Sequence, residues 1–152
     1  MKKGNVLIIL SDQDLNMDQL TIPAAMAVGA VHHRLINEGV RCDCNIIVET
    51  ASTWNSHHFA VLLGYGASAV YPYLAFNIIN DLIIRNSFDR KSYASHVQNF
   101  IKGINKGLLK IMSKMGISCV SSYRGAQLFE TIGIDSNAVS YTHLTLPTKR
   151  IV

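Results

Sequence analysis

The sequence is poor in charged residues and cysteine, and it has no long uninterrupted apolar segment. Asp, Glu, Lys and Arg make up 16% of the residues, against roughly 25% in typical soluble domains. Three cysteines are too few for a disulfide framework and predict a reducing, cytoplasmic environment. No apolar run approaches the roughly 18 residues that span a bilayer. Asp12 and Asp14 also end the first apolar stretch too early for a signal peptide.

What the chain does contain fits one globular domain. Its 152 residues are 49% hydrophobic and include one Trp, six Tyr and five Phe, which excludes a disordered chain. The charge content is low for this size, so we expect either that the chain buries more of itself than its size suggests or that part of its surface packs against something else.

The composition of residues 139–152 differs abruptly from that of the preceding sequence. They are rich in threonine, continue no helix or strand pattern, and resemble the translated read-through of a transposon-end adapter used in DNA sequencing. We therefore expect residues 1–138 to be the native domain and residues 139–152 to be a non-native tail; a genuine strand-like tail is the alternative. Without Lys149 and Arg150, 12 basic residues (14 minus 2) face 10 acidic ones, which is no nucleic-acid signature.

The remaining pattern alternates between strand-like and helix-like segments. Continuous apolar runs predict buried parallel strands, and the pattern as a whole predicts an α/β fold with a mostly parallel sheet. We expect either a partial doubly wound sheet or an incomplete βα-barrel. The expected strands are 6–10, 45–48, 69–71 and 117–120; the expected helices are 21–38, 56–63 (capped by Ser56), 73–85 (apolar all round and hence buried), 93–115 and 126–132.

Polar residues follow the predicted strands, where α/β proteins commonly bind ligands. Four strand ends carry such residues, and adjacent strands would place them on one face: Ser11 and Asp12, Glu49 and Thr50, Tyr71 and Tyr73, and Ser121, Ser122, Tyr123 and Arg124. A carboxylate pair there could perform acid–base chemistry, since neighbouring like charges separate their pKa values. The alternative is that Asp12 and Glu49 cap helices or pair with Arg124.

Other motifs indicate packing more than chemistry. Cys42 and Cys44 are too closely spaced for a zinc pair, and an extended segment would point both to one face. The glycines of Gly64-Tyr-Gly66 precede a strand, which is the wrong order for a dinucleotide-binding turn. A row of lysines at four-residue spacing predicts a solvated helix face, with an anion-binding ridge as the alternative; its members are Lys102, Lys106, Lys110 and Lys114.

Several segments, in order along the chain, resemble the large subunit of bacterial NADPH-dependent glutamate synthase. They are 6–12 (VLIILSD), 22–33 (IPAAMAVGAVHH), 47–51 (IVETA), 57–66 (HHFAVLLGYG), 71–75 (YPYLA), 106–118 (KGLLKIMSKMGIS) and 122–126 (SYRGA). The resemblance runs from about residue 6 to residue 135. It is to the latter part of the central domain, which joins the glutaminase domain to the FMN-binding barrel.

The resemblance implies an enzyme that makes L-glutamate from L-glutamine and 2-oxoglutarate. In that family an N-terminal cysteine releases ammonia, which travels through a tunnel to FMN; an iron–sulfur cluster and a small NADPH-oxidising subunit supply electrons. Cys42, Cys44 and Cys119 match neither the nucleophile nor the cluster ligands. We therefore expect this piece to bind no cofactor or metal, to be inactive alone, and to wall part of the tunnel.

The resemblance also implies that the partners are the glutaminase and FMN domains of the same parent chain. Lys114, Tyr123 and Arg124 lie in segments 106–118 and 122–126, which carry much of the resemblance, so they are candidates for contact with the FMN domain. Asp12 and Glu49 are further candidates for contacts between domains. Two alternatives remain: a free-standing α/β module that binds anions or nucleotides, and a piece of a small TIM-barrel enzyme. No membrane or nucleic-acid partner is expected.

Overall fold

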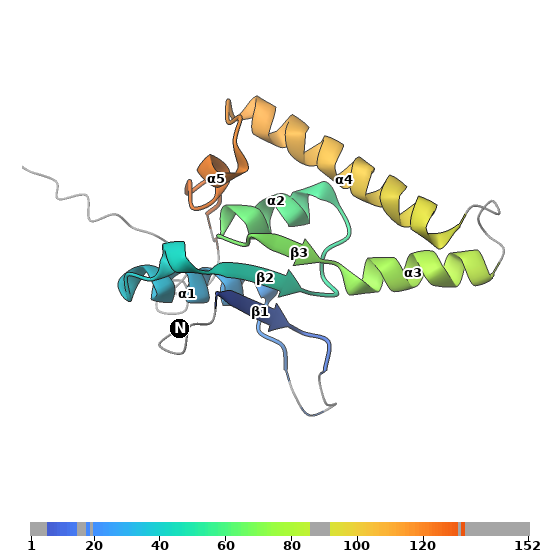
Figure 1. The fold of residues 1–152 in the computed structure, drawn as a ribbon, viewed down its shortest axis with the longest axis horizontal. Helices are drawn as coiled ribbons and strands as arrows, with labels where there is room; N and C mark the ends of the chain where they lie inside the picture. The colour runs from blue at the N-terminus through green and yellow to red at the C-terminus, as the bar shows by residue number, and fades with distance from the viewer. Residues whose placement is uncertain (1–5, 15–17, 19, 86–91, 131, 133–152) are drawn as a thin grey trace, which may run out of the picture.

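In the computed structural model, residues 6–14, 18, 20–85, 92–130 and 132 are described, and they form a small parallel sheet with helices packed beside it (Figure 1). The elements in chain order are β1 (Leu7–Ser11), α1 (Ala24–Asn37), the 3-10 turn η1 (Arg41–Asp43), β2 (Asn45–Glu49), α2 (Ser56–Gly64), β3 (Ala69–Tyr71), α3 (Tyr73–Ile84), α4 (Tyr93–Lys114) and α5 (Val120–Tyr123). The predicted α/β class with a parallel sheet is confirmed.

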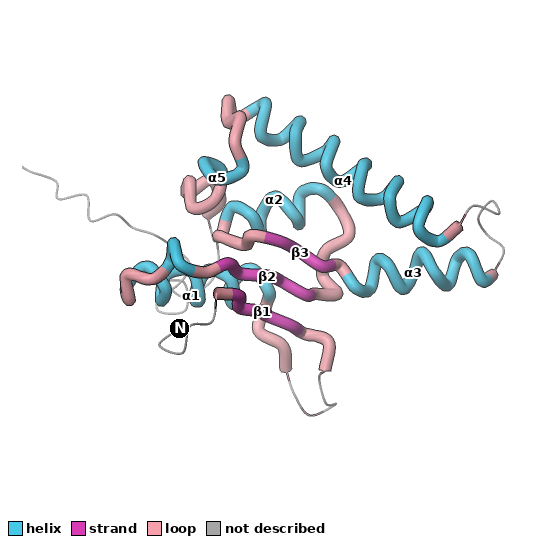
Figure 2. Tube along the Cα trace, viewed as in Figure 1, coloured by secondary structure: helices cyan, strands magenta, loops and turns pink. Residues whose placement is uncertain are grey.

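The sheet has the strand order β1-β2-β3, with both neighbouring pairs parallel (Figure 2). Ile8 lies beside Ile46, and Val48 lies beside Val70. Parallel neighbours need a crossover between them, and α1 and α2 supply the two crossovers. The sequence and the structure therefore agree on these three strands.

Both crossover helices pack on the same face of the sheet. Val28 and Leu35 of α1 and Leu62 of α2 form one core cluster with Ile46 and Val48 of β2. Two successive crossovers that run in the same direction place their helices on one face both in one half of a doubly wound sheet and in a βα-barrel. The described residues are therefore compatible with both predicted arrangements. None of the described helices is long and apolar enough to cross a membrane.

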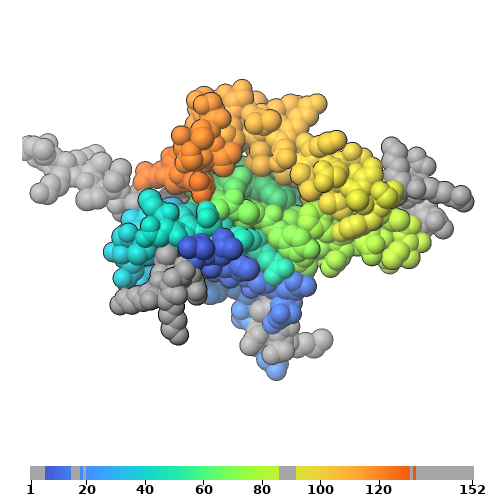
Figure 3. Space-filling view, in the orientation of Figure 1, coloured from blue at the N-terminus to red at the C-terminus, as the bar shows by residue number. Residues whose placement is uncertain are grey.

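The opposite face of the sheet is open, which corrects the prediction for the first strand. We predicted that residues 6–10 would be buried on both faces, but Leu7 is 56% and Ile9 63% exposed. Figure 3 shows β1 at the surface of the molecule. An apolar run is thus sufficient to form a strand here even though one face has no cover among the described residues.

The helix ends follow local chemistry, with one correction. Pro23 precedes α1 and Gly39, at φ +70°, follows it, as predicted. The cap of α2 is Asn55 rather than Ser56, because the Asn55 side-chain oxygen accepts the backbone N–H of His58 at 3.0 Å. Ser56 is the first residue inside the helix.

The long helix α4 packs on α2, on the side away from the sheet. The apolar residues that recur at spacings of four and three along this helix predict a buried stripe, with members Val97, Ile101, Ile104, Leu108, Ile111 and Met115. Ile104 is buried, and Leu108 and Ile111 pack against a second core cluster, but Met115 is 43% exposed. Met112, outside the predicted stripe, is buried and joins Ala60 of α2 in that cluster. The prediction that α3 is buried is wrong, since none of its residues is buried and Ile78 is 44% exposed. Helix α3 contacts α4 along only one side.

The predicted fourth strand and final helix are also wrong. Residues 117–119 carry no strand, and α5 occupies Val120–Tyr123. Gly116, at φ +69°, turns the chain back so that Ile117 packs against the second core cluster instead of the sheet. Residues 126–130 are not helical, because Gly125 and Gln127 both have positive φ. Residue 131 and the predicted tail at 139–152 lie outside the described residues.

Candidate functional site

The carboxyl ends of the strands bring two of the candidate residues together. Ser11 lies beside Glu49 in the sheet register, and Glu49 lies beside Tyr71. Asp12 follows β1 directly, and its N–H donates to the Glu49 carbonyl at 3.2 Å. Asp12 and Glu49 therefore occupy one edge of the sheet because the strands are parallel and in register.

Each carboxylate at this edge has its own hydroxyl partner. The Ser11 hydroxyl donates to Glu49 Oε2 at 2.6 Å, and the Thr50 hydroxyl donates to Asp12 Oδ2 at 2.5 Å. The Ala51 N–H also donates to Asp12 Oδ1 at 3.1 Å. Asp12 thus closes the loop after β2. It caps no helix, and Glu49 pairs with a hydroxyl and not with Arg124.

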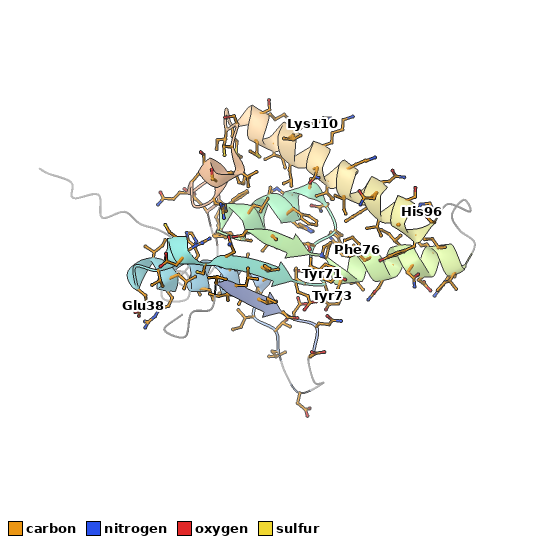
Figure 4. The ribbon with its side chains drawn as sticks, in the orientation of Figure 1. Glu38, Tyr71, Tyr73, Phe76, His96 and Lys110 are labelled. Atoms are coloured by element: carbon orange, nitrogen blue, oxygen red, sulfur yellow. The ribbon has the colours of Figure 1, made fainter. Side chains whose placement is uncertain are left out.

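Tyr73, which the sequence places with Tyr71 at the end of the third strand, also lies at this edge (Figure 4). Its hydroxyl lies 3.5 Å from the Asp12 carbonyl. Partial burial, followed by the neighbouring Asp12 and Glu49 carboxylates, raises the pKa of the Tyr73 hydroxyl. The hollow beside Asp12, Glu49 and Thr50 has a volume of about 40 Å³, which has room for little more than a water molecule. The polar groups at this edge hydrogen-bond to one another and hold a loop closed, and they do not form a substrate pocket.

Arg124 and Tyr123 lie elsewhere, which corrects the expectation that all the strand ends share one face. Arg124 Nη1 donates to the Ser68 hydroxyl at 3.1 Å, and Ser68 directly precedes β3. Arg124 is therefore at the amino edge of the sheet, opposite Asp12. Tyr123 is 2% exposed and packs against Phe129, and burial raises the pKa of its hydroxyl.

A buried histidine and an arginine form the most highly connected polar cluster at that amino edge. Arg41 Nε donates to His32 Nδ1 at 2.8 Å, Nη1 donates to the Cys44 carbonyl at 2.9 Å, and Nη2 donates to the Gly66 carbonyl at 2.7 Å. One guanidinium thereby ties α1, β2 and the turn before β3 together. The sequence predicted one buried, hydrogen-bonded histidine in the His32-His33 pair, but nothing in it indicated Arg41 as its partner.

The environment of His32 keeps its ring neutral. Burial lowers the pKa of His32 to about 4, and the nearby guanidinium of Arg41 adds to this effect. Because Nδ1 accepts the Arg41 hydrogen bond, protonation at Nδ1 would remove the bond and place two cations side by side. His32 is therefore a structural acceptor.

Gly66 has a packing role in the same cluster. It has φ +117°, and a Cβ built there would collide with the His32 ring. The Gly66 carbonyl also accepts a hydrogen bond from Arg41.

Lys114 is exposed at the last position of α4. The other three lysines of the predicted row, Lys102, Lys106 and Lys110, are also exposed, and Figure 4 shows Lys110 directed away from the sheet. This arrangement matches a solvated helix face.

The cysteines do not form a metal centre. Cys44 is buried in the core and its thiol lies 3.6 Å from the Val40 carbonyl, whereas Cys42 and Cys119 are exposed. Cys42 lies inside the 3-10 turn η1 and is exposed, whereas Cys44 directly follows the turn and is buried, so the segment is not extended and the two cysteines do not share a face, which corrects that expectation. Within the described parts of the chain, no three His, Cys, Asp or Glu side chains are grouped to hold a metal, so these residues do not fit an iron–sulfur cluster.

Comparison with known proteins gives one consistent family. The glutamate synthase central domain family matches residues 1–135. The ferredoxin-dependent glutamate synthase of Pyropia yezoensis is 45% identical over 148 residues, covering 90% of this chain and 10% of that protein. The glutamate synthase [NADPH] large chain of Bacillus subtilis is 45% identical over 139 residues, covering 91% and 9%.

A third relative is the glutamate synthase [NADH] of Schizosaccharomyces pombe, which is 39% identical over 141 residues and of which this chain covers 7%. The chain thus spans about a tenth or less of the length of the curated relatives it matches. The match is to one domain of a much larger type of enzyme, and this chain belongs to the glutamate synthase central domain family.

Proposed function

We propose that this chain works as part of a glutamate synthase, as a central domain that joins a glutaminase domain to an FMN-binding domain. The family match over residues 1–135 carries the proposal. The overall reaction converts glutamine, 2-oxoglutarate, two electrons and two protons into two glutamates. The three free cysteines suit a reducing cytoplasm.

The residues of this chain contribute structure to that reaction. Ammonia that reached bulk water would be protonated and lost, so the path between the two active sites must be walled by protein. A low charge content and an exposed apolar sheet face suit such a wall. The family resemblance assigns FMN, the iron–sulfur cluster and the electron donor to other parts of the enzyme, and the cysteines of the described residues are not grouped as cluster ligands.

This domain does not select the electron donor. A relative named as ferredoxin-dependent and a relative named for NADPH are each 45% identical to this chain. A region that selected the donor would be expected to resemble one type more than the other. NADPH with a small oxidising subunit remains our proposal for the parent enzyme, resting on the resemblance to bacterial two-subunit enzymes.

The first test is to extend the reading frame of the source DNA in both directions. Glutaminase-like sequence upstream and barrel sequence downstream would support the proposal. Genuine start and stop codons at both ends would favour the alternative, a free-standing α/β module whose exposed lysine row attracts anions.

The functional test uses a complete enzyme that carries this segment. Lys114→Ala and Arg124→Ala should uncouple the two activities, so that more ammonia is released from glutamine per glutamate formed. Ser68→Ala is the matched control for Arg124→Ala, because it removes the same hydrogen bond without removing the charge. An unchanged ratio of ammonia to glutamate in both variants would contradict the assignment of these residues.

A further inference from the structure

The open face of the sheet is an unusual surface for a parallel β-structure. Leu7 and Ile9 are more than half exposed, and Tyr71 is 48% exposed on the same face. Parallel sheets are almost always covered on both faces. Within the described ranges, α1 and α2 pack on the other face, where they form the first core cluster with β2.

The composition of this face resembles that of an interface. Ile9 and Ile47 lie side by side in the centre, with Leu7 next along β1. At the carboxyl end of the face, Ser11 and Glu49 form a hydrogen bond. An apolar centre with a polar rim is the usual anatomy of a surface that is covered by protein.

We propose that in the complete enzyme this face is covered by another segment of the same large polypeptide, with apolar side chains against Ile9 and Ile47. This inference rests on the proposed function. Only Oε2 of Glu49 has a partner among the described residues, so the covering segment is expected to place a hydrogen-bond donor near Oε1.

The size of the open face favours a segment of the same polypeptide over a second copy of the chain as the protein that covers it. Three residues of β1, three of β2 and two of β3 point to it. A stable interface between separate chains uses about 20–30 residues on each side. A segment of the same polypeptide needs far less area, because it loses little translational and rotational freedom when it docks.

The accessibility of single cysteines tests the proposal in a complete enzyme that carries this segment. Ile9→Cys and Ile47→Cys are placed in a background where Cys42 and Cys119 are serine. Mass spectrometry of proteolytic peptides then measures maleimide labelling at the introduced cysteine, separately from the other cysteines of the enzyme, before and after unfolding in guanidinium. Protection of at least about 10-fold in the native enzyme is expected at both positions, as is typical of buried thiols. Less protection at either position would overturn the proposal. Ile46→Cys, on the covered face, serves as the protected reference.

A photo-crosslinking residue at Leu7 identifies what covers the face. A crosslink within the same polypeptide is expected, whereas a crosslink to a second copy or to another subunit would overturn the proposal. The ratio of ammonia released to glutamate formed is measured on the unsubstituted enzyme and on the Ile9→Cys enzyme, which separates the two hypotheses. A coupled enzyme with a reactive Ile9→Cys refutes the covered face alone, whereas an unsubstituted enzyme that makes no glutamate refutes the proposed function.

Discussion

The two faces of the sheet have nearly the same chemistry and opposite environments. Ile46 and Ile47 are neighbours on β2, yet Ile46 is 0% exposed beneath α1 and α2 while Ile47 points to the open face. Ile8 and Ile9 differ in the same way on β1. An apolar strand thus indicates where protein is expected to pack, and not whether that protein lies within the same 152 residues.

Polar contacts also stabilise the covered face. Among the described residues, the open face lacks such contacts. Arg41 joins α1 to the ends of β2 and α2 through His32, Cys44 and Gly66. On the open face, the Ser11–Glu49 hydrogen bond lies at the edge. The stability of this domain should therefore depend strongly on one face and weakly on the other.

The largest expected effect comes from truncating the covered face. Ile46→Ala should lower the free energy of unfolding by about 4 kcal/mol, because it leaves a cavity in a fully buried site. Ile47→Ala, the matched control on the open face, should cost less than about 1 kcal/mol in this chain. Urea unfolding of the two variants measures the difference, and equal losses would show that both faces are covered.

The buried histidine should make the covered face sensitive to acid. The pKa of His32 is about 4 in the folded chain against 6.5 as the ordinary value, so the unfolded chain binds this proton more readily. Its contribution is complete above about pH 6.5, and about 3 kcal/mol is lost as the pH falls from 6.5 to 4. Urea midpoints measured across this range should show the loss, and His32→Gln should flatten it. A slope that survives in His32→Gln would assign the acid sensitivity to other groups.

A smaller difference should separate two glycines that both have positive φ. Gly39→Ala should cost about 1 kcal/mol from backbone strain, since nothing lies within 4 Å of the added Cβ. Gly66→Ala should cost about 2 kcal/mol more, because the new Cβ collides with the His32 ring. Thermal and urea unfolding of both variants provide the comparison. Equal costs would mean that the contact between His32 and Gly66 relaxes freely.

Local patterns predicted most of the elements correctly. The strands at 45–49 and 69–71 and the long helix of residues 93–114 follow from apolar periodicity and from Pro and Gly at the ends. The prediction failed at residues 117–120, where an apolar run is also compatible with a turn that packs under α4. It also failed for α3, because an apolar helix can be covered by protein that is not among the described residues.

The candidate site likewise combines features that the sequence predicts with features that it does not predict. Parallel strands in register were enough to predict that Asp12 and Glu49 share an edge, since that follows from strand direction alone. The position of Arg124 could not be predicted, because it depends on how α4 and α5 return the chain to Ser68. The His32–Arg41–Gly66 cluster depends likewise on three turns meeting at one point.

The amino-acid sequence was sufficient for the α/β alternation, for most helix ends and for membership of the glutamate synthase central domain family. These properties depend on short-range patterns and on the order of motifs. The low charge content likewise indicated a surface to be covered, without locating it. Only the folded chain established that α1 and α2 share a face, that β1 is open, and that Arg124 lies opposite Asp12. Those properties arise from contacts between segments far apart in the chain, which no local pattern encodes.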